Sequence, residues 1–224
     1  MFRQLYTALV SENTVNRAFE NLTDMLDHGR WMFEQANDVL HGRTPAEQVG
    51  DSLYERDQAI NALERSIRRK VLRHLTVNPG YDVAICLALM SVAKDAERIG
   101  DYCKSVFEVG CLYTEGFHVE KYQKPLDEMA EQMLVMFSAV IEATRQSDEG
   151  HAGKALLQAA EMRRRCDEII RELFRDEGQI EFHEAVAYSL LARHYKRVAG
   201  HLANIATAVL GRLEDLDFYP GKDA

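Results

Sequence analysis

Proline and glycine, the residues that most often interrupt helices, are scarce in this sequence. Four prolines and 13 glycines are spread over 224 residues, so long uninterrupted helices are possible. Sustained alternation of apolar and polar residues, which would indicate strands, is also lacking. The sequence therefore predicts an all-α protein made of six long helices joined by short turns.

An excess of basic residues is lacking too. The formal net charge is −9 and the isoelectric point is near 5.4. This balance argues against sequence-independent nucleic-acid binding and disfavours adsorption to anionic lipid.

The longest apolar run, Val83 to Met90, is too short to cross a bilayer. The N-terminal residues are too few and too polar for a signal peptide, so we expect a cytoplasmic protein without membrane insertion.

The four cysteines lack the C-x-x-C spacing of metal or redox motifs. They are Cys86, Cys103, Cys111 and Cys166. Cys86 and Cys103 fall in one predicted helix, too far apart to be bridged. We expect free, buried thiols in a reducing compartment.

The stretch around residues 85–106 shows the clearest helical pattern. Its apolar positions recur at spacings of 4, 3, 4, 3, 4 and 3, which is typical of a helix packed in coiled-coil fashion; they are Ile85, Leu89, Val92, Ala96, Ile99, Cys103 and Val106. Glu97 and Asp101 lie four residues apart, on one face that points away from this seam. Such carboxylates repel unless a cation lies between them. They indicate either a metal or partner site or an ordinary solvated acidic face, and spacing alone favours the solvated face.

Turn signals divide the chain into helices at about residues 13–40, 44–75, 81–113, 122–145, 155–176 and 182–213. A short amphipathic start with Phe2, Leu5, Tyr6 and Leu9 is a lead-in to the first helix or a small docking element. The first helix should turn Phe19, Leu22, Leu26, Phe33 and Leu40 inward, and Trp31 with Met25, Met32 and Phe33 is expected to be core rather than interface. Thr44, Pro45 and Glu47 predict a capped start for the second helix.

A weak internal repeat accompanies these helices. With a shift of 99 residues the seam pattern recurs at Tyr188, Leu191, Tyr195, Val198, Leu202, Ile205 and Val209, and with a shift of 106 Ile60–Leu63 pairs with Cys166–Ile169. The two shifts differ by seven residues, or about two helical turns, which keeps the packing phase. The predicted architecture is two tandem three-helix bundles, residues 1–115 and 116–224, the second a diverged copy of the first.

Two motifs in the first repeat give the chain a family resemblance. A-K-D-A-E-R-I-G-D spans Ala93 to Asp101, and R-D-Q-A-I-N spans Arg56 to Asn61. With the duplication, they make residues 13–213 resemble the PhoU family. The second repeat departs from the family pattern: Lys196 stands where a glutamate is expected and Gly200 where an aspartate is expected. Arg163 occupies the first acid position of the fifth helix, leaving Asp167.

The resemblance implies a metal site in the first repeat. Its ligands would be Asp57, Asn61, Glu97 and Asp101, an oxygen-rich set that suits magnesium, manganese or ferric iron better than zinc. The resemblance also implies that some family members bind iron, zinc or manganese clusters through these acids. The alternative is an acidic face partly neutralised by Lys94 and Arg98.

In the second repeat, fixed positive charges disfavour a metal. Lys196 and Arg163 are expected to pair with Asp167 or with acids of a partner, or else to form a solvated basic face. The residues we expect to contact a partner are Arg98, Arg163, Lys196, Arg197 and His201.

The function implied by the resemblance is restraint of phosphate uptake by protein contact. Partners would be the cytoplasmic part of an ABC-type phosphate transporter or a sodium–phosphate symporter, a sensor histidine kinase, and a second copy in a homodimer; the protein would lie at the inner membrane through its partner. Two alternatives remain: a metal-loaded bundle with redox chemistry, and a purely structural adaptor. Di-iron bundles need inward Glu-x-x-His pairs, and the one match, Glu115 to His118, falls in a predicted turn. We therefore expect no catalytic residues.

Overall fold

The all-α prediction is confirmed by the structure, a computed structural model that describes residues 2–80, 82–176, 178 and 180–218. The described residues form six long helices and one short 3-10 helix, with no β-strand among them. The α-helices are α1 (Phe2–Leu40), α2 (Ala46–Val77), α3 (Val83–Leu112), α4 (Glu120–Gln146), α5 (Glu149–Leu173) and α6 (Phe182–Val209), and the 3-10 helix is η1 (Leu213–Asp215).

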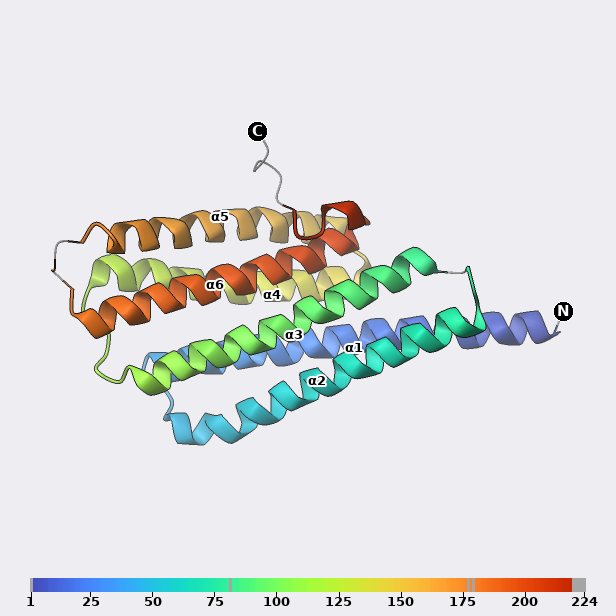
Figure 1. The fold of residues 1–224 in the computed structure, drawn as a ribbon, viewed down its shortest axis with the longest axis horizontal. Helices are drawn as coiled ribbons and strands as arrows, with labels where there is room; N and C mark the ends of the chain where they lie inside the picture. The colour runs from blue at the N-terminus through green and yellow to red at the C-terminus, as the bar shows by residue number, and fades with distance from the viewer. Residues whose placement is uncertain (1, 81, 177, 179, 219–224) are drawn as a thin grey trace.

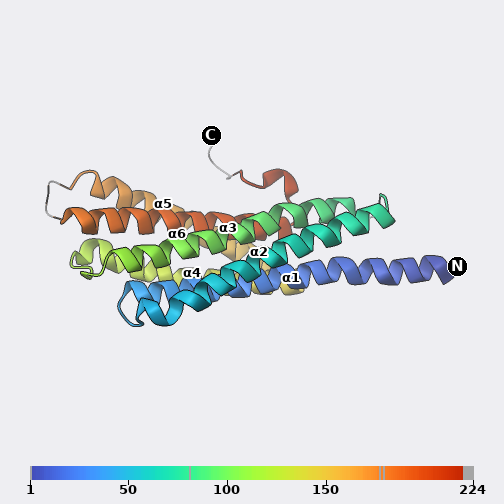
Figure 2. The ribbon, with the colours of Figure 1, turned by 60° about the horizontal axis from the view of Figure 1, so that its bottom comes forward.

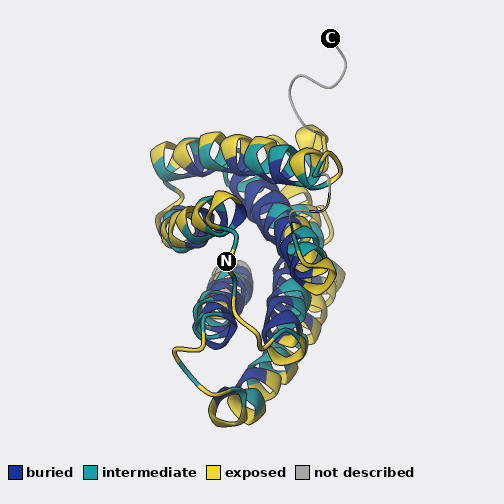
Figure 3. Ribbon diagram, turned by 90° about the vertical axis from the view of Figure 1, so that its left-hand side faces the viewer, coloured by how far each residue is buried: buried dark blue, intermediate teal, exposed yellow. Residues whose placement is uncertain are grey.

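The six helices form two three-helix bundles that lie side by side along their length (Figure 1). Helices α3 and α6 run antiparallel next to each other at the centre, with α2 beyond α3 and α5 beyond α6. Helices α1 and α4 pack behind this layer and also contact each other (Figures 2 and 3). The predicted pair of tandem bundles is thus confirmed, while the division at residue 115 stays a prediction.

The seam predicted for α3 is buried in six of its seven positions. Leu89 through Val106 of that set are each no more than 3% exposed, but Ile85 is 39% exposed. The prediction for Ile85 is wrong because Cys86, fully buried, takes the inward position in the first turn of α3. In α6 the matching seam is buried from Tyr188 to Ile205, and Val209 is half-buried.

Several predicted helix ends differ from the observed ones. Thr44 does not cap α2: the N-cap residue is Pro45, without a side-chain cap, and the helix begins at Ala46. Helix α5 starts earlier than predicted, because the Asp148 side chain accepts hydrogen bonds from the backbone N–H groups of Gly150 and His151. Helix α6 ends at Val209 rather than near residue 213, where η1 follows.

Helix α1 is continuous from Phe2, so the predicted amphipathic start is part of the first helix; its side chains lie outside the described residues. Farther along α1, the residues predicted to point inward are buried, except Phe19, which is half-buried; the buried ones are Leu22, Leu26, Phe33 and Leu40. Met25 and Met32 are also buried, while Trp31 is half-buried beneath the guanidinium group of Arg56 at 4.1 Å.

All four cysteines are free thiols, as predicted, but only three of them are buried. Cys111 is exposed because it lies on the outer side of the last turns of α3. Burial raises the pKa of the Cys166 thiol to about 12, so this thiol is protonated and unreactive at neutral pH.

Aromatic packing joins the two bundles into a common core. The Phe33 ring of α1 lies 5.9 Å from that of Phe137 in α4 and 5.2 Å from that of Tyr195 in α6. The Tyr195 hydroxyl donates a buried hydrogen bond to the side-chain oxygen of Asn37. Aromatic pairs contribute stability beyond that of the apolar area that they bury. This cluster therefore couples the stability of one repeat to that of the other.

The connection between the two bundles is held by one buried carboxylate. Glu184 of α6 is 2% exposed and accepts hydrogen bonds from the backbone N–H groups of His118 and Val119, at 2.6 and 3.1 Å. The Tyr188 hydroxyl donates a third, at 3.0 Å. A buried charge is tolerated when its acceptor sites are filled in this way, and the segment before α4 is thereby fixed against α6.

Candidate functional site

A lysine lies between the acids of the first repeat. Asp57 of α2 and Asp101 of α3 both contact the Lys104 ammonium group, at 2.9 and 3.2 Å. Burial alone would lower the pKa of Lys104, but hydrogen bonds from its ammonium to the two carboxylates outweigh burial and raise it. Lys104 therefore stays charged and joins α2 to α3.

The other predicted metal ligands are near this lysine along the helices. Glu97 contacts the Lys94 ammonium at 2.6 Å, and Arg98 lies between the two acids, 3.8 Å from Glu97 and 3.2 Å from Asp101. Asn61 is half-buried one turn after Asp57 on α2. The acids of the first repeat are thus balanced by three cations of α3, of which the sequence analysis had named Lys94 and Arg98.

These donors do not fit a metal ion as they are arranged. Among the residues that the structure describes, no three histidine, cysteine, aspartate or glutamate side chains converge in a way that could hold one. A metal bridging Asp57 and Asp101 would have to displace the Lys104 ammonium, which already provides the positive charge that two adjacent carboxylates require. The metal site stays a prediction that the geometry does not support.

The second repeat carries a related lysine–carboxylate contact. Lys196 of α6 lies 2.5 Å from Asp167 of α5, so the predicted pairing of these two residues is confirmed. Arg163, one turn before Asp167, is half-buried and has interactions of its own. Each repeat thus joins its second and third helices by a lysine on the third. The lysines occupy different positions, since Lys196 aligns with Glu97 rather than with Lys104.

A polar cluster lies where α3 meets α6. Asp95 is 8% exposed, and its Oδ1 atom lies 2.8 Å from both the His201 Nδ1 atom and the Asn204 side-chain nitrogen. The Tyr102 ring stacks on His201 at 5.7 Å and lies 5.9 Å from the ring of His194. His201, which we expected to contact a partner, is therefore engaged between the repeats, and its partner role stays a prediction.

Two arginines occupy equivalent exposed positions beside this cluster. Arg98 on α3 and Arg197 on α6 are 99 residues apart and both exposed. The Arg197 guanidinium lies 5.9 Å from the centre of the Tyr102 ring. Together they place two guanidinium groups on the exposed side of the α3–α6 layer, and contact with a partner remains a prediction for both.

Asp95 and Lys104 are residues that the sequence analysis missed. Lys104 follows Asp101 by three residues, which is a spacing for ion pairs on a helix, so that signal was available. Asp95 stands one position before the seam residue Ala96. In the sequence it is one of several acids in the same stretch. Its partners lie more than 100 residues away in α6, so no local spacing indicates its role.

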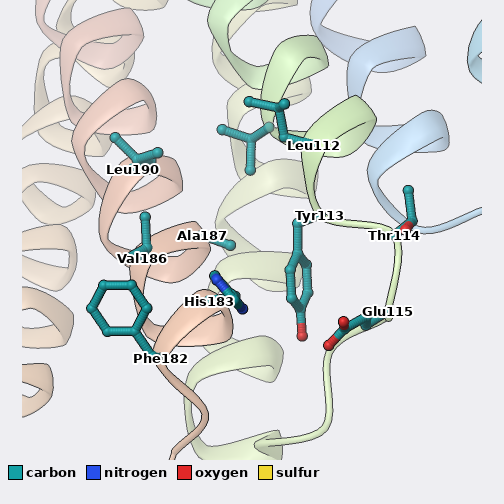
Figure 4. Close-up of a pocket in the computed structure, with 10 residues that line it drawn as sticks. Leu112, Tyr113, Thr114, Glu115, Phe182, His183, Val186, Ala187 and Leu190 are labelled. Atoms are coloured by element: carbon teal, nitrogen blue, oxygen red, sulfur yellow. The ribbon is translucent and has the colours of Figure 1, made fainter.

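A separate apolar groove lies at the end of the molecule where α3 ends and α6 begins (Figure 4). Its volume is about 360 Å³, and exposed side chains of both helices line it, including Leu112, Phe182, Val186 and Leu190. Polar groups reach it from Tyr113, Glu115 and His183. The groove is mainly an apolar surface.

The fold and the paired helix motifs define the class of this chain as a two-repeat, six-helix bundle with charged helix faces. The PhoU domain model matches residues 22–109 and again residues 126–209. The chain belongs to the PhoU family.

Known relatives agree with this assignment. The chain is 26% identical over 223 residues to a phosphate-specific transport system accessory protein PhoU homolog of Xylella fastidiosa strain Temecula1, covering 95% of this chain and 88% of the relative. It is 25% identical over 190 residues to the PhoU homolog 1 of Thermotoga maritima, covering 79% of this chain and 78% of that protein.

Solved structures show the same fold. The crystal structure of PhoU from Pseudomonas aeruginosa matches with a TM-score of 0.79 at 21% identity, covering 91% of this chain and 98% of that one. The phosphate transport system regulatory protein PhoU from Streptococcus pneumoniae matches with a TM-score of 0.72 at 19% identity, covering 92% and 97%. Within the described part of this chain, no helix combines the length and apolarity needed to span a bilayer.

Proposed function

We propose that this protein is a cytoplasmic regulator of inorganic phosphate uptake that acts by contact with a phosphate transport system rather than by catalysis. The observation that carries the proposal is the match of two PhoU domains over most of the chain. Relatives that align over nearly the whole chain are named as accessory proteins of phosphate-specific transport. A sensor kinase as second partner and a homodimer are further expectations from the same resemblance.

The docking surface in this proposal is the exposed side of the α3–α6 layer around Arg98 and Arg197. Support comes from their equivalent exposed positions on the two repeats and from the acids beside Arg98, which give the surface both signs of charge. Charged groups at a rim set the association rate and the choice of partner, so reversing them should weaken docking without unfolding the chain.

Phosphate uptake in a strain that lacks its own copy of the gene tests this proposal. The wild-type protein should restore restrained uptake, and Arg98→Glu with Arg197→Glu should not. Arg164→Glu with Arg171→Glu is the matched control, because it makes the same change in net charge at two exposed arginines of α5. Unchanged uptake on deletion of the gene would refute the phosphate role. Normal restraint by the double variant would refute only the docking surface.

A metal-tuned form of this function makes a separate prediction. It requires Lys104 to leave Asp57 and Asp101, so that manganese, iron, magnesium or zinc can replace the ammonium. Elemental analysis of the protein purified without a histidine tag, beside Glu97→Ala with Asp101→Ala, distinguishes the two states. Stoichiometric metal in the wild type alone would support metal tuning, whereas no metal in either protein would leave Lys104 as the cation of this site.

A further inference from the structure

The far end of the α2–α3 hairpin differs in charge from the rest of the molecule. Between Glu64 and Asp82 the chain has no acidic residue. This stretch contains five arginines and lysines within nine positions, namely Arg65, Arg68, Arg69, Lys70 and Arg73. All but Lys70, which is half-buried, are exposed. A chain with a net charge of −9 thus has one strongly basic end.

The neighbouring acids leave this end basic. Glu64 is 7% exposed and contacts the Arg68 guanidinium at 2.7 Å, and Asp82 contacts His74 at 3.2 Å. Arg17 of α1 adds to the positive charge, since after burial it is the strongest cause lowering the pKa of Lys70. Glu20 of α1 opposes this effect and raises the pKa of Lys70, so the basic charge of this end comes mainly from α2.

Large apolar side chains are exposed at the same end. Leu72 of α2 is 69% exposed and Leu87 of α3 is 60% exposed, and Val77, Val83 and Met90 are exposed beside them. Arg65, Arg69 and Leu72 follow helical spacings of 4 and 3 residues on the outer side of α2, as do Val83, Leu87 and Met90 on α3. The two helices pack against each other and the His74–Asp82 contact joins them at the tip, so the two stripes lie on adjacent helices at one end of the hairpin. We call the six residues of these stripes the hairpin face.

We propose that the hairpin face adsorbs to a bilayer surface rich in anionic phospholipid headgroups. Arginine guanidinium groups bind phosphate oxygens with two parallel hydrogen bonds. Apolar side chains between the arginines can enter the boundary between headgroups and acyl chains, while the long arginine stems keep their charges at the phosphates. A basic face without the exposed leucines, or leucines without the arginines, would not combine both contacts.

The net charge of the protein does not prevent this contact. Charges separated by more than about 8 Å are largely screened at physiological ionic strength, so a membrane interacts with the part of the protein that faces it. The hairpin lies at one end of an elongated molecule (Figures 1 and 2), and most acids lie along the bundle behind it.

Sedimentation with lipid vesicles tests the proposal. The full chain should sediment with vesicles that contain phosphatidylglycerol and remain in solution with pure phosphatidylcholine, and added salt should release it. Arg65→Glu with Arg69→Glu should weaken binding at least about tenfold, because each basic residue near the surface contributes about a fivefold change. Leu72→Ser with Leu87→Ser should weaken it independently of salt.

A control with the same change in net charge separates the hairpin face from charge in general. Arg164→Glu with Arg171→Glu alters two exposed arginines of α5 and should bind vesicles as the wild type does. Far-ultraviolet circular dichroism confirms that each variant is folded. If the wild type does not sediment with phosphatidylglycerol vesicles, the proposal is overturned. An acidic protein would then be the expected partner of the hairpin face. Equal losses in the α2 and α5 variants would overturn it as well. Neither outcome affects the uptake experiment.

Discussion

At the scale of single residues, Asp95 shows how one buried carboxylate connects the two repeats. One of its oxygens contacts both His201 and Asn204 of α6. Helix periodicity predicts which residues of α3 point inward, but it says nothing about which residues of α6 meet them. For this reason the sequence placed His201 on a helix face and assigned it to a partner, while the structure engages it with Asp95 in the same chain.

Replacing Asp95 by alanine should destabilise the protein markedly. The loss of this acceptor leaves the partly buried His201 and Asn204 side chains without that bond, which costs about 1–3 kcal/mol of unfolding free energy. Asp101→Ala, a half-exposed acid in surface ion pairs, should cost less than about 1 kcal/mol. Urea unfolding of both variants measures the difference. Equal losses of unfolding free energy would show that Asp95 does not stabilise the protein more than Asp101 does.

Three histidines should make the protein less stable in mild acid. Burial lowers the pKa of His194, with a further contribution from Arg193, and burial likewise lowers the pKa values of His28 and His41. The unfolded chain, whose histidines have the ordinary pKa of 6.5, binds more protons than the folded one, so stability falls as the pH falls through this value. Urea unfolding at neutral pH and below pH 6.5 should show the loss.

His194→Gln provides the control for this pH dependence. It removes one of the three titrating groups, so the loss of stability on acidification should be smaller than in the wild type. An identical loss in the variant would mean that His194 is equally protonated in both states. The His194 Nδ1 atom has no hydrogen-bond partner in the structure, so the substitution sacrifices no such bond at that atom.

At the scale of elements, the sequence predicted which helices exist better than where they begin. Long apolar periodicity fixed all six helices, because each buries a continuous stripe. The position of a helix end depends on a single capping group, and several residues that could cap the helix often lie close together there. Thr44 and Asp148 are both plausible caps by residue type, but only Asp148 accepts hydrogen bonds from the backbone of the helix that follows. The ion pairs of Lys104 were predictable only in part. The spacing of Asp101 and Lys104 along α3 indicates one pair, but the contact with Asp57 joins two helices and has no signal in the sequence.

Two glycines within helices should respond to alanine with opposite signs. A Cβ atom at Gly110 of α3 would lie 3.1 Å from the Cα and N atoms of Leu40, whereas one at Gly153 of α5 would meet nothing within 4 Å. Gly110→Ala should therefore cost about 1–3 kcal/mol, because the backbones of α1 and α3 must separate. Gly153→Ala should gain about 0.5–1 kcal/mol from helix propensity. Thermal or urea unfolding of the two variants checks both signs.

At the scale of the whole molecule, the two repeats should unfold together. Packing of α1 on α4 and of α3 on α6 merges their cores, with Phe33 between Phe137 and Tyr195. Trp31 is the single tryptophan and lies in the first repeat, so its fluorescence reports that repeat, while circular dichroism reports both. The two signals should change at the same urea concentration.

Phe33→Ala should lower that common midpoint through a loss of about 3–5 kcal/mol. The two signals should still coincide in the variant, since the cavity weakens the core of both repeats. A fluorescence transition that precedes the loss of helical signal would instead show that the repeats are separate folding units.

The lysine between Asp57 and Asp101 has a consequence for the cell that makes this protein. A cation held by coordination comes and goes with the supply of metal, whereas one attached to the chain is present in every copy from the moment it folds. With Lys104 in place, the positive charge between the two acids is supplied by the chain itself. While Lys104 holds this position, the site keeps the same charge in metal-starved and in metal-replete cells.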